Sequence, residues 1–157
     1  MGWGPGTIGM SLGLFAIGIA VVQGLLMKPI LQRLGERNTV IVGLSIDVCV
    51  FIFLCFVTNG WLALALTPIT ALGSVAGPAL QGIMSRSVAD NQQGELQGVL
   101  TGVNAIATII GPLVMTQTFW LFTSAAAPIY LPGAPFLLAG LLIVVTIAMF
   151  MRVRIAS

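Results

Sequence analysis

The sequence predicts an all-α integral membrane protein with five transmembrane helices, and its low charge content is the first reason. Of its 157 residues, 58% are apolar and only 6% are charged, whereas soluble domains carry about 25% charged residues. Six Lys/Arg and four Asp/Glu residues are too few to cover a water-soluble chain of this length, so lipid must surround most of it. A disordered chain is also excluded, because such chains are polar and charged.

The spacing of the charged residues is the second reason, because it sets the number of helices. Residues 1–27 carry no charge, residues 38–85 carry only Asp47, and residues 96–151 carry none. A membrane-spanning helix needs about 20 apolar residues. These three stretches therefore hold one, two and two helices.

Turn-forming residues divide the two longer stretches. Thr58-Asn59-Gly60 divides the second stretch, and the prolines at 128, 132 and 135 divide the third, because proline is poorly tolerated inside a helix. The predicted spans are 6–30, 39–57, 61–85, 96–122 and 134–151.

The basic residues predict the orientation of the helices. All six lie at the end of the first, third or fifth span or directly after it, and the loops after the second and fourth spans have none. Basic loops stay in the cytoplasm, which places the N-terminus outside and the C-terminus inside. An odd number of spans with an external N-terminus and no export signal predicts that further sequence lies upstream. The basic residues are Lys28, Arg33, Arg37, Arg86, Arg152 and Arg154.

Small residues and prolines predict how the helices pack and bend. Glycines recur at four-residue spacing, as at Gly73 and Gly77 and along Gly94, Gly98 and Gly102, which places them on one helix face where backbones can approach closely. Pro78 and Pro112 lie inside predicted spans, and each removes a helical hydrogen bond. These features fit plain helix packing and a moving helix equally well.

Asp47 is the strongest single indication of function. It is the ninth residue of the predicted span 39–57, close to the bilayer centre, where a charged side chain costs at least ~2.5–3.5 kcal/mol. Protonation of the carboxyl group, or a polar cavity or partner, would lower that cost. Either arrangement would allow Asp47 to take up and release a proton. A structural hydrogen bond to a neighbouring helix is the alternative.

Gln23 and Asn104 are the strongly polar residues in the cytoplasmic halves of their predicted helices. An amide both donates and accepts hydrogen bonds, so these two residues are candidates for lining a substrate cavity. They could equally bond to one another or to backbone across helices.

The sequence offers no group for chemical catalysis. It has no His, and its single Lys lies at the end of a span rather than within the membrane, so there is no nucleophile–base pair; the phosphate-binding pattern GxxxxGK[ST] is also missing. Two Cys without a carboxylate cluster exclude a structural zinc site. We expect a non-enzyme without metal or cofactor, and the scattered basic residues give no reason to expect nucleic acid as a partner.

Several segments of the chain resemble drug:proton antiporters of the major facilitator superfamily, in the tetracycline-efflux branch. Residues 28–37 (KPILQRLGER) resemble the second-half copy of the cytoplasmic loop signature G-x-x-x-D-R-x-G-R-R, matching at Arg33, Gly35 and Arg37. Further similarity to the tetracycline-efflux branch lies in residues 77–82, 85–86, 93–98, 110–113 and 131–136.

This resemblance implies roles for individual residues. The five spans would be helices 8–12 of a 12-helix transporter whose first half and helix 7 are missing. Asp47 falls on the acidic position of helix 9 that is associated with proton coupling, and Gln23 on a helix 8 position that carries Gln. Gly111-Pro112 resembles the helix 11 counterpart of the antiporter signature, so Gly77, Pro78, Gly111 and Pro112 are expected at packing or kink positions.

The resemblance also implies a role for the loop at 28–37, which would help to hold the cytoplasmic face shut through ion pairs. Arg33, Gly35, Glu36 and Arg37 are the candidate gating residues, with Glu36 as an internal partner of the arginines. Simple anchoring by positive charge is the alternative.

The function implied by the resemblance is transport. The chain would be part of a proton-coupled efflux pump for tetracycline or similar amphipathic drugs in the bacterial cytoplasmic (inner) membrane. Its partners would be the lipid bilayer, protons, the drug and the missing N-terminal half. The alternative is a truncated, non-transporting remnant or a structural membrane protein, and the coding sequence upstream of Met1 distinguishes the two.

Overall fold

The computed structural model describes residues 5–57, 60–124, 127 and 129–153, and these residues are almost entirely helical, as predicted. In chain order the elements are α1 (Pro5–Val21), the π-helical turn η1 (Val22–Leu26), α2 (Met27–Phe56), α3 (Gly60–Gly73), α4 (Ala76–Arg86), the 3-10 turn η2 (Asp90–Gln92), α5 (Gln93–Thr123) and α6 (Ala134–Arg152).

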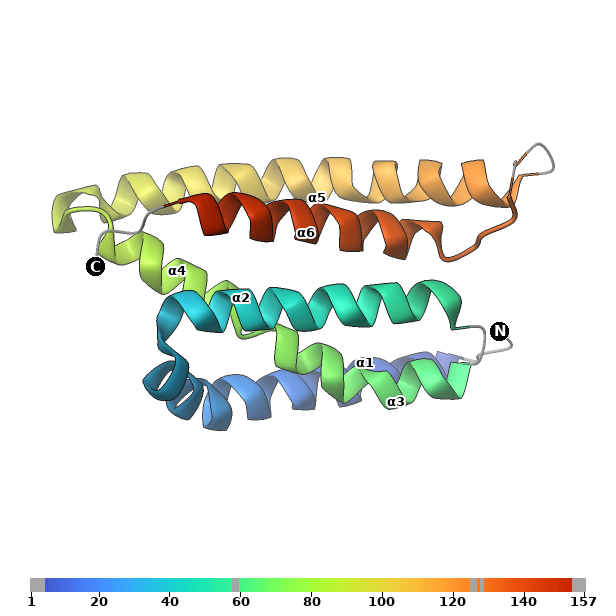
Figure 1. Cartoon of the computed structure of the whole chain (residues 1–157), viewed down its shortest axis with the longest axis horizontal. Helices are drawn as coiled ribbons and strands as arrows, with labels where there is room; N and C mark the ends of the chain where they lie inside the picture. Colours follow the sequence, from blue (N-terminus) through green and yellow to red (C-terminus); the bar gives the residue numbers. More distant parts are fainter. Residues whose placement is uncertain (1–4, 58–59, 125–126, 128, 154–157) are drawn as a thin grey trace.

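A reversal at Gly35 folds the N-terminal third of the chain back on itself. Gly35 has φ 73° and ψ 165° and interrupts α2. Glycine adopts a positive φ without steric cost because it has no Cβ. The chain turns back at this point, so that α1 and the longer part of α2 lie antiparallel (Figure 1).

Three continuous helical stretches within the described residues are long and apolar enough to cross a membrane. They are Gly9–Phe56, Asp90–Thr123 and Ala134–Arg152. The first contains 48 residues and would extend about 70 Å as one straight helix, more than twice the ~30 Å of a bilayer's hydrocarbon core. The reversal at Gly35 divides this stretch into two antiparallel parts.

The predicted span 61–85 consists of two helices, because α3 ends at Gly73 and α4 begins at Ala76. Pro78 explains the break: its ring clashes with the carbonyl four residues earlier, on Ser74. The N–H groups of Ser74 and Val75 donate instead to carbonyls three residues back, at 3.2 and 3.5 Å. Pro78 thus lies in the first turn of α4, where a missing N–H costs little.

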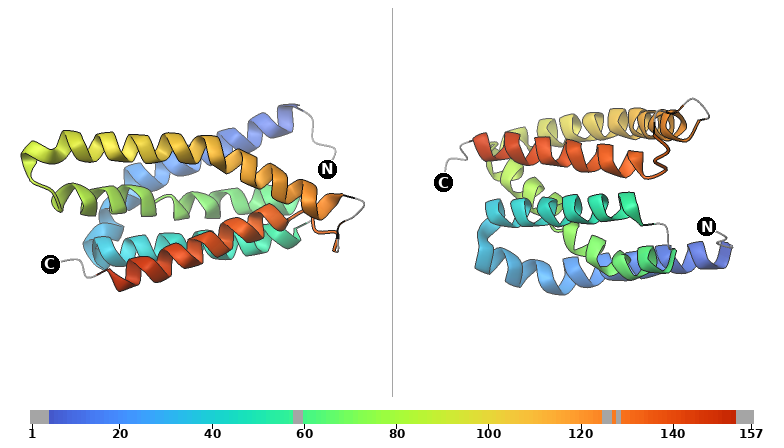
Figure 2. Two further views of the ribbon diagram at one scale, coloured as in Figure 1. Left: turned by 90° about the horizontal axis from the view of Figure 1, so that it is seen from above. Right: turned by 45° about the vertical axis from the view of Figure 1, so that its right-hand side comes forward.

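The centre of the fold is α2, which packs against α6, α4 and α3. Figure 1 shows α2 between the pair formed by α1 and α3 and the two helices α5 and α6. The left view of Figure 2 shows that α5 and α6 are close where the chain connects them and diverge towards their other ends. A small buried cluster of Val22, Ala71 and Val75 joins α1, η1 and the break between α3 and α4. The chain therefore has a core around α2, and α5 lies at its margin.

One end of the bundle collects the charged residues, and we call it the charged end. It is the end where the chain turns at Gly35, where α4 leads into α5 and where α6 finishes (left in Figure 1). Of the charged side chains that the structure describes, only Asp47 lies elsewhere. Those at the charged end are Lys28, Arg33, Glu36, Arg37, Arg86, Asp90, Glu95 and Arg152.

Candidate functional site at Asp47 and the charged end

Asp47 lies midway along the longer part of α2, with its carboxylate against Gly73, the last residue of α3. It is eleven residues beyond Glu36, which corresponds to about 16 Å along the helix. A Cβ atom added to Gly73 would overlap the Asp47 carboxylate. The missing side chain of Gly73 therefore provides the space that this carboxylate occupies.

The Asp47 side chain is half-buried and has no polar partner. Within the part of the chain that the structure describes, its carboxyl group makes neither a hydrogen bond nor an ion pair. The hydroxyl groups nearest along α3 are already engaged: Thr70 donates to the Thr67 carbonyl at 2.6 Å, and Ser74 to the Ala71 carbonyl at 2.7 Å. The structural alternative for Asp47, a hydrogen bond to a neighbouring helix, is therefore not observed among these residues.

The break between α3 and α4 is held by close contacts of small residues. A Cβ on Gly43 of α2 would lie 2.9 Å from the Ala76 Cβ and 3.0 Å from the Gly73 carbonyl oxygen. A Cβ on Gly18 of α1 would lie 2.8 Å from the Ala71 Cβ. Real Cβ contacts are longer than this, so glycine is needed at both positions for α1 and α2 to approach the break.

Most of the glycines that recur at four-residue spacing have no close neighbour among the described residues. A Cβ at Gly77 or Gly111 would meet nothing within 4 Å among the described residues. The same holds for Gly9, Gly13, Gly24, Gly94, Gly98 and Gly102. Four-residue spacing correctly places these glycines on a common helix face, but it does not indicate whether the chain itself provides a neighbour for that face.

The two amide candidates lie far apart in the fold. Gln23 lies in η1 and Asn104 in α5, and both are exposed. Because α1 packs against α3 whereas α5 packs chiefly against α6, the chain does not gather the two amides into one pocket. Any cavity that contains both needs further walls beyond these helices.

An exposed polar stripe on α5 extends the surface around Asn104 and was missed in the sequence. Gln97, Thr101, Asn104 and Thr108 recur at intervals of four, three and four residues, which places them on one helix face. All four are exposed, and no residue of α5 is buried. The helical spacing of polar residues was the signal that could have revealed this stripe.

Pro112 lies inside α5, which is uninterrupted from Gln93 to Thr123. Figure 2 (left) shows α5 bending partway along its length. A hollow of about 390 Å³ lies beyond Pro112 in the chain, lined by residues that include Leu113, Gln117 and Trp120.

The predicted loop residues bind other helices rather than one another. Glu36 forms an ion pair with Arg86 at the end of α4, and the Arg37 guanidinium donates to the Met151 carbonyl near the end of α6 at 3.1 Å. The expectation that Glu36 pairs with Arg33 or Arg37 is therefore wrong. Arg33 is exposed and has no hydrogen bond or ion pair to a described residue.

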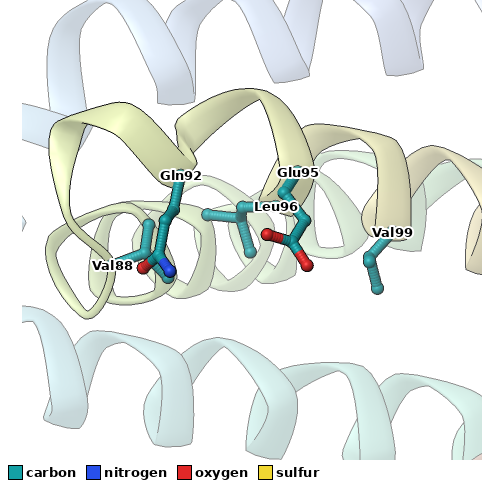
Figure 3. A pocket seen from close by; sticks show the side chains of 5 residues that line it. All are labelled: Val88, Gln92, Glu95, Leu96 and Val99. Carbon is teal, nitrogen blue, oxygen red and sulfur yellow. The ribbon is translucent and has the colours of Figure 1, made fainter.

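A second polar contact closes the turn between α4 and α5. The Gln93 amide donates to the Ser85 carbonyl at 2.7 Å, and the Ser85 hydroxyl donates to the Gln93 side-chain oxygen at 3.0 Å. Beside this turn lies a hollow of about 290 Å³, lined by Val88, Gln92, Glu95, Leu96 and Val99 (Figure 3). It presents one carboxylate and one amide on an apolar floor, open to the surroundings of the charged end.

Comparison with known proteins gives a consistent result. The profile of the Major Facilitator Superfamily matches residues 1–155. Among curated proteins, the class G tetracycline resistance protein of Vibrio anguillarum is 38% identical over 117 residues, 74% of this chain and 30% of that protein. The class C tetracycline resistance protein of Escherichia coli is 37% identical over the same shares.

More distant similarity extends to animals. The hippocampus abundant transcript-like protein 1 of Rattus norvegicus is 25% identical over 160 residues, which cover 93% of this chain and 32% of that protein. The chain thus spans about 30% of the length of the curated relatives that it matches. No solved structure matches it.

Proposed function

Because this chain belongs to the major facilitator superfamily, we propose that it forms five membrane spans of a proton-coupled exporter of tetracycline or a similar amphipathic drug. The chain is a multi-pass membrane protein related to tetracycline efflux proteins. In our proposal it corresponds to helices 8–12 of a 12-helix transporter, and it works together with a first half and a helix 7 that are absent from these 157 residues.

The helices support a count of five. The first span comprises α1, η1 and the part of α2 before Gly35, and the second is the rest of α2. The third is α3 followed by α4 across the break, and α5 and α6 are the fourth and fifth. In favour of this count, α1 begins at the end of the bundle opposite to the one where α6 finishes (Figure 1).

We propose that the charged end faces the cytoplasm of a bacterial cell and that the membrane is the cytoplasmic (inner) one. Basic segments remain on the cytoplasmic side during insertion. All basic residues that the structure describes lie at this end. A single orientation of the bundle therefore places every basic connection between helices on the cytoplasmic side.

The observation that carries the proposed function is the position of Asp47. It is the one described charge away from the charged end, and nothing in the described chain compensates it. An ionised carboxyl group at this depth is costly, and a proton removes the charge. Binding of an external proton to Asp47 would thus favour a different helix arrangement from the ionised state. Alternating access would exchange that proton for a drug molecule moving outwards.

The substrate path in this proposal runs along surfaces that the chain leaves open. Asn104 and the polar stripe on α5 are exposed, as is Gln23, and each can bind polar groups of a drug whose rings lie on apolar neighbours. The missing half would supply the opposite wall.

The loop residues divide into two roles in this proposal. Glu36 and Arg37 tie α2 to α4 and α6, so they brace this half as one body. Arg33 is unpaired within the described chain, which leaves it available to contact the other half when the cytoplasmic face closes.

Tetracycline–proton exchange in inverted membrane vesicles tests the proposal. The vesicles carry the transporter of which this chain forms the last five spans. Asp47→Asn keeps the size of the side chain but cannot bind a proton, so we expect drug-driven proton flux to be lost, whereas Asp47→Glu keeps part of it. Unchanged flux in Asp47→Asn would contradict the coupling role.

The 157-residue chain alone provides the second arm of this test. Because the proposed path needs both halves, we expect no drug flux from the chain by itself. The alternative, a non-transporting remnant or structural membrane protein, predicts that no coding sequence for seven further spans precedes Met1.

A further inference from the structure

The first span changes from an α-helix to a wider π turn, η1, just before the segment that carries Arg33. In this turn the Met27 N–H donates to the Val22 carbonyl, five residues back, whereas an α-helix uses the fourth residue back. Pro29 explains the change, because in an unbroken α-helix its ring would clash with the Leu25 carbonyl. The π turn holds one more residue than an α turn, so it rotates the helix after it by about 100° relative to an unbroken α-helix.

This π turn determines which side chains of the first span face the break between α3 and α4. Val22 belongs to the buried cluster at the break, and Met27 and Ile30 pack against that cluster, at intervals of five and then three residues. In an unbroken α-helix, the residues following Val22 on the same face would be Leu26 and Pro29, at intervals of four and three. Both sets are apolar, so the first span can cover the cluster in either form.

A short helical segment, residues 27–34, lies between the π turn and the reversal at Gly35, and we call it the linking segment. None of its residues is buried. Gly35 has φ 73°, and a Cβ there would meet nothing within 4 Å among the described residues. The helices on either side are anchored, because Gly18 of α1 is in close contact with α3 and Thr39 and Val40 of α2 are fully buried. The linking segment can therefore rotate while its neighbours stay in place.

Arg33 changes its surroundings when the linking segment rotates. With the π turn it is exposed and has no hydrogen bond or ion pair to a described residue. In an unbroken α-helix it would follow Val22 by about three turns on the same face and take the place that Leu34 has now. Leu34 is 41% exposed, so an arginine in that place keeps its contact with water. Neither form of the segment buries the charge of Arg33.

We propose that the linking segment is a rotating element with two states, a π form that presents Arg33 to the missing half of the transporter and an α form that turns Arg33 towards α3 and α4. This inference rests on the proposed function, in which Arg33 contacts the other half when the cytoplasmic face closes. Conversion from the π form to the α form withdraws Arg33 and shifts the segment by about one residue, ~1.5 Å along its axis, which opens that face. Helices at contacts move between discrete arrangements of this kind.

The first experiment measures the rotation by pulsed electron paramagnetic resonance on the 157-residue chain in nanodiscs of phosphatidylethanolamine and phosphatidylglycerol. Spin labels at Gln32→Cys in the linking segment and Phe53→Cys near the far end of α2 report one distance, with both native cysteines replaced by alanine. Both label sites are exposed. Pro29→Ala supplies the missing N–H and removes the ring, so we expect the α form and a distance that differs by several ångströms from that of the labelled parent chain.

Deletion of Gly24 in the Pro29→Ala background is the matched control. It removes the additional residue from an unbroken helix, so Met27 and Ile30 return to the cluster and Arg33 to its exposed place. No described atom outside the local helix lies within 4 Å of the Gly24 Cβ position, so no side chain packs at the deleted site. We expect this double variant to show the parent distance. An unchanged distance in Pro29→Ala, or a double variant that keeps the Pro29→Ala distance, would overturn the proposal.

Thiol crosslinking reads the same rotation with Pro29 left in place. In the cysteine-free chain, Met27→Cys paired with Val75→Cys should crosslink rapidly, because Met27 packs against the cluster that contains Val75. Leu26→Cys paired with Val75→Cys should crosslink more slowly, each time the segment visits the α form. Gly24→Cys lies on the opposite side of the helix from Val22 and gives the background. A Leu26 pair that stays at background while the Met27 pair reacts completely would overturn the proposal.

Transport by the whole transporter tests the gating role of the rotation separately. The Pro29→Ala variant without Gly24 holds Arg33 towards the other half in a helix that cannot switch, so we expect drug transport to be lost, and full transport would overturn the gating role. Asp47→Asn should lose transport and keep the parent distance. The distance and crosslinking measurements use no drug, so they can fail while the coupling role of Asp47 stands.

Discussion

The two longest helices of the chain, α2 and α5, are packed in opposite ways. α2 has five buried residues and contacts α3, α4 and α6, whereas α5 has none and leans mainly on α6. Both helices carry polar residues along their middle. On α2 the polar group is a carboxyl held against a neighbour, and on α5 it is an open stripe. In this chain, α2 stabilises the fold through its contacts with other helices, whereas α5 exposes its side chains to its surroundings.

The largest expected effect is a loss of stability of the chain when α2, but not α5, is substituted. Gly43→Leu places a side chain where Ala76 and the Gly73 carbonyl already lie within 3.0 Å, so we expect a loss of about 2–3 kcal/mol or more from overpacking. Gly98→Leu on α5 is the matched control, because nothing lies within 4 Å of its Cβ. Thermal unfolding of the detergent-solubilised chain checks this. Equal losses in both variants would remove the distinction between α2 and α5.

The next effect concerns function rather than stability. Asn104→Leu removes the amide from the exposed stripe of α5, so the 157-residue chain should keep its stability within about 0.5 kcal/mol. In the transporter, we expect drug transport to fall about tenfold, which corresponds to the loss of roughly one hydrogen bond to the drug. Vesicle uptake measures it. A clear loss of stability with unchanged transport would reverse the roles of the two helices.

A smaller effect is expected where α2 contacts α6 at the charged end. Arg37→Ala removes the hydrogen bond to the Met151 carbonyl, and since this bond is exposed we expect a loss of about 0.5–1 kcal/mol. Hydrogen exchange in the last turn of α6 should speed up as well. Arg33→Ala is the control, because Arg33 has no bond to a described residue and should leave both quantities unchanged.

The smallest effect is expected for the ion pair between α2 and α4. The Arg86 side chain is 74% exposed and that of Glu36 23%, so solvent screens the pair and its coupling should be about 0.2–1 kcal/mol. A double-mutant cycle of Glu36→Gln and Arg86→Gln measures it, and added salt should reduce it. Coupling above 2 kcal/mol would show that the pair is far less exposed in the membrane.

The sequence predicted the features that depend on spacing along the chain. The scarcity of charge predicted a helical membrane protein, and the position of Asp47 within its apolar stretch identified it as the unusual residue. Gly35 was placed in the turn between two helices by its basic neighbours. Each of these inferences depends only on which residues are close to one another along the sequence.

The features that depend on neighbours in space were missed or wrong. Pro78 was expected to kink one helix and instead separates two. Glu36 was assigned to nearby arginines but pairs with Arg86, fifty residues away. The role of Gly73 depends on the carboxyl group that faces it from another helix. The sequence around a glycine does not indicate which residue will contact it in the folded chain. Such contacts form when α2 packs against other helices, and they join residues from segments that are far apart in the sequence.

The number of membrane crossings underlies the whole account, and the sidedness of the two chain ends tests it most directly. Reporter tags on the N- and C-termini of the chain, probed with a membrane-impermeant reagent in intact cells and in inverted vesicles, give this sidedness. With five crossings, we expect the N-terminal tag to be accessible only from outside the cell and the C-terminal tag only from the cytoplasm. Both tags on the same side would mean an even number of crossings, and Asp47 would no longer belong to the second of five spans.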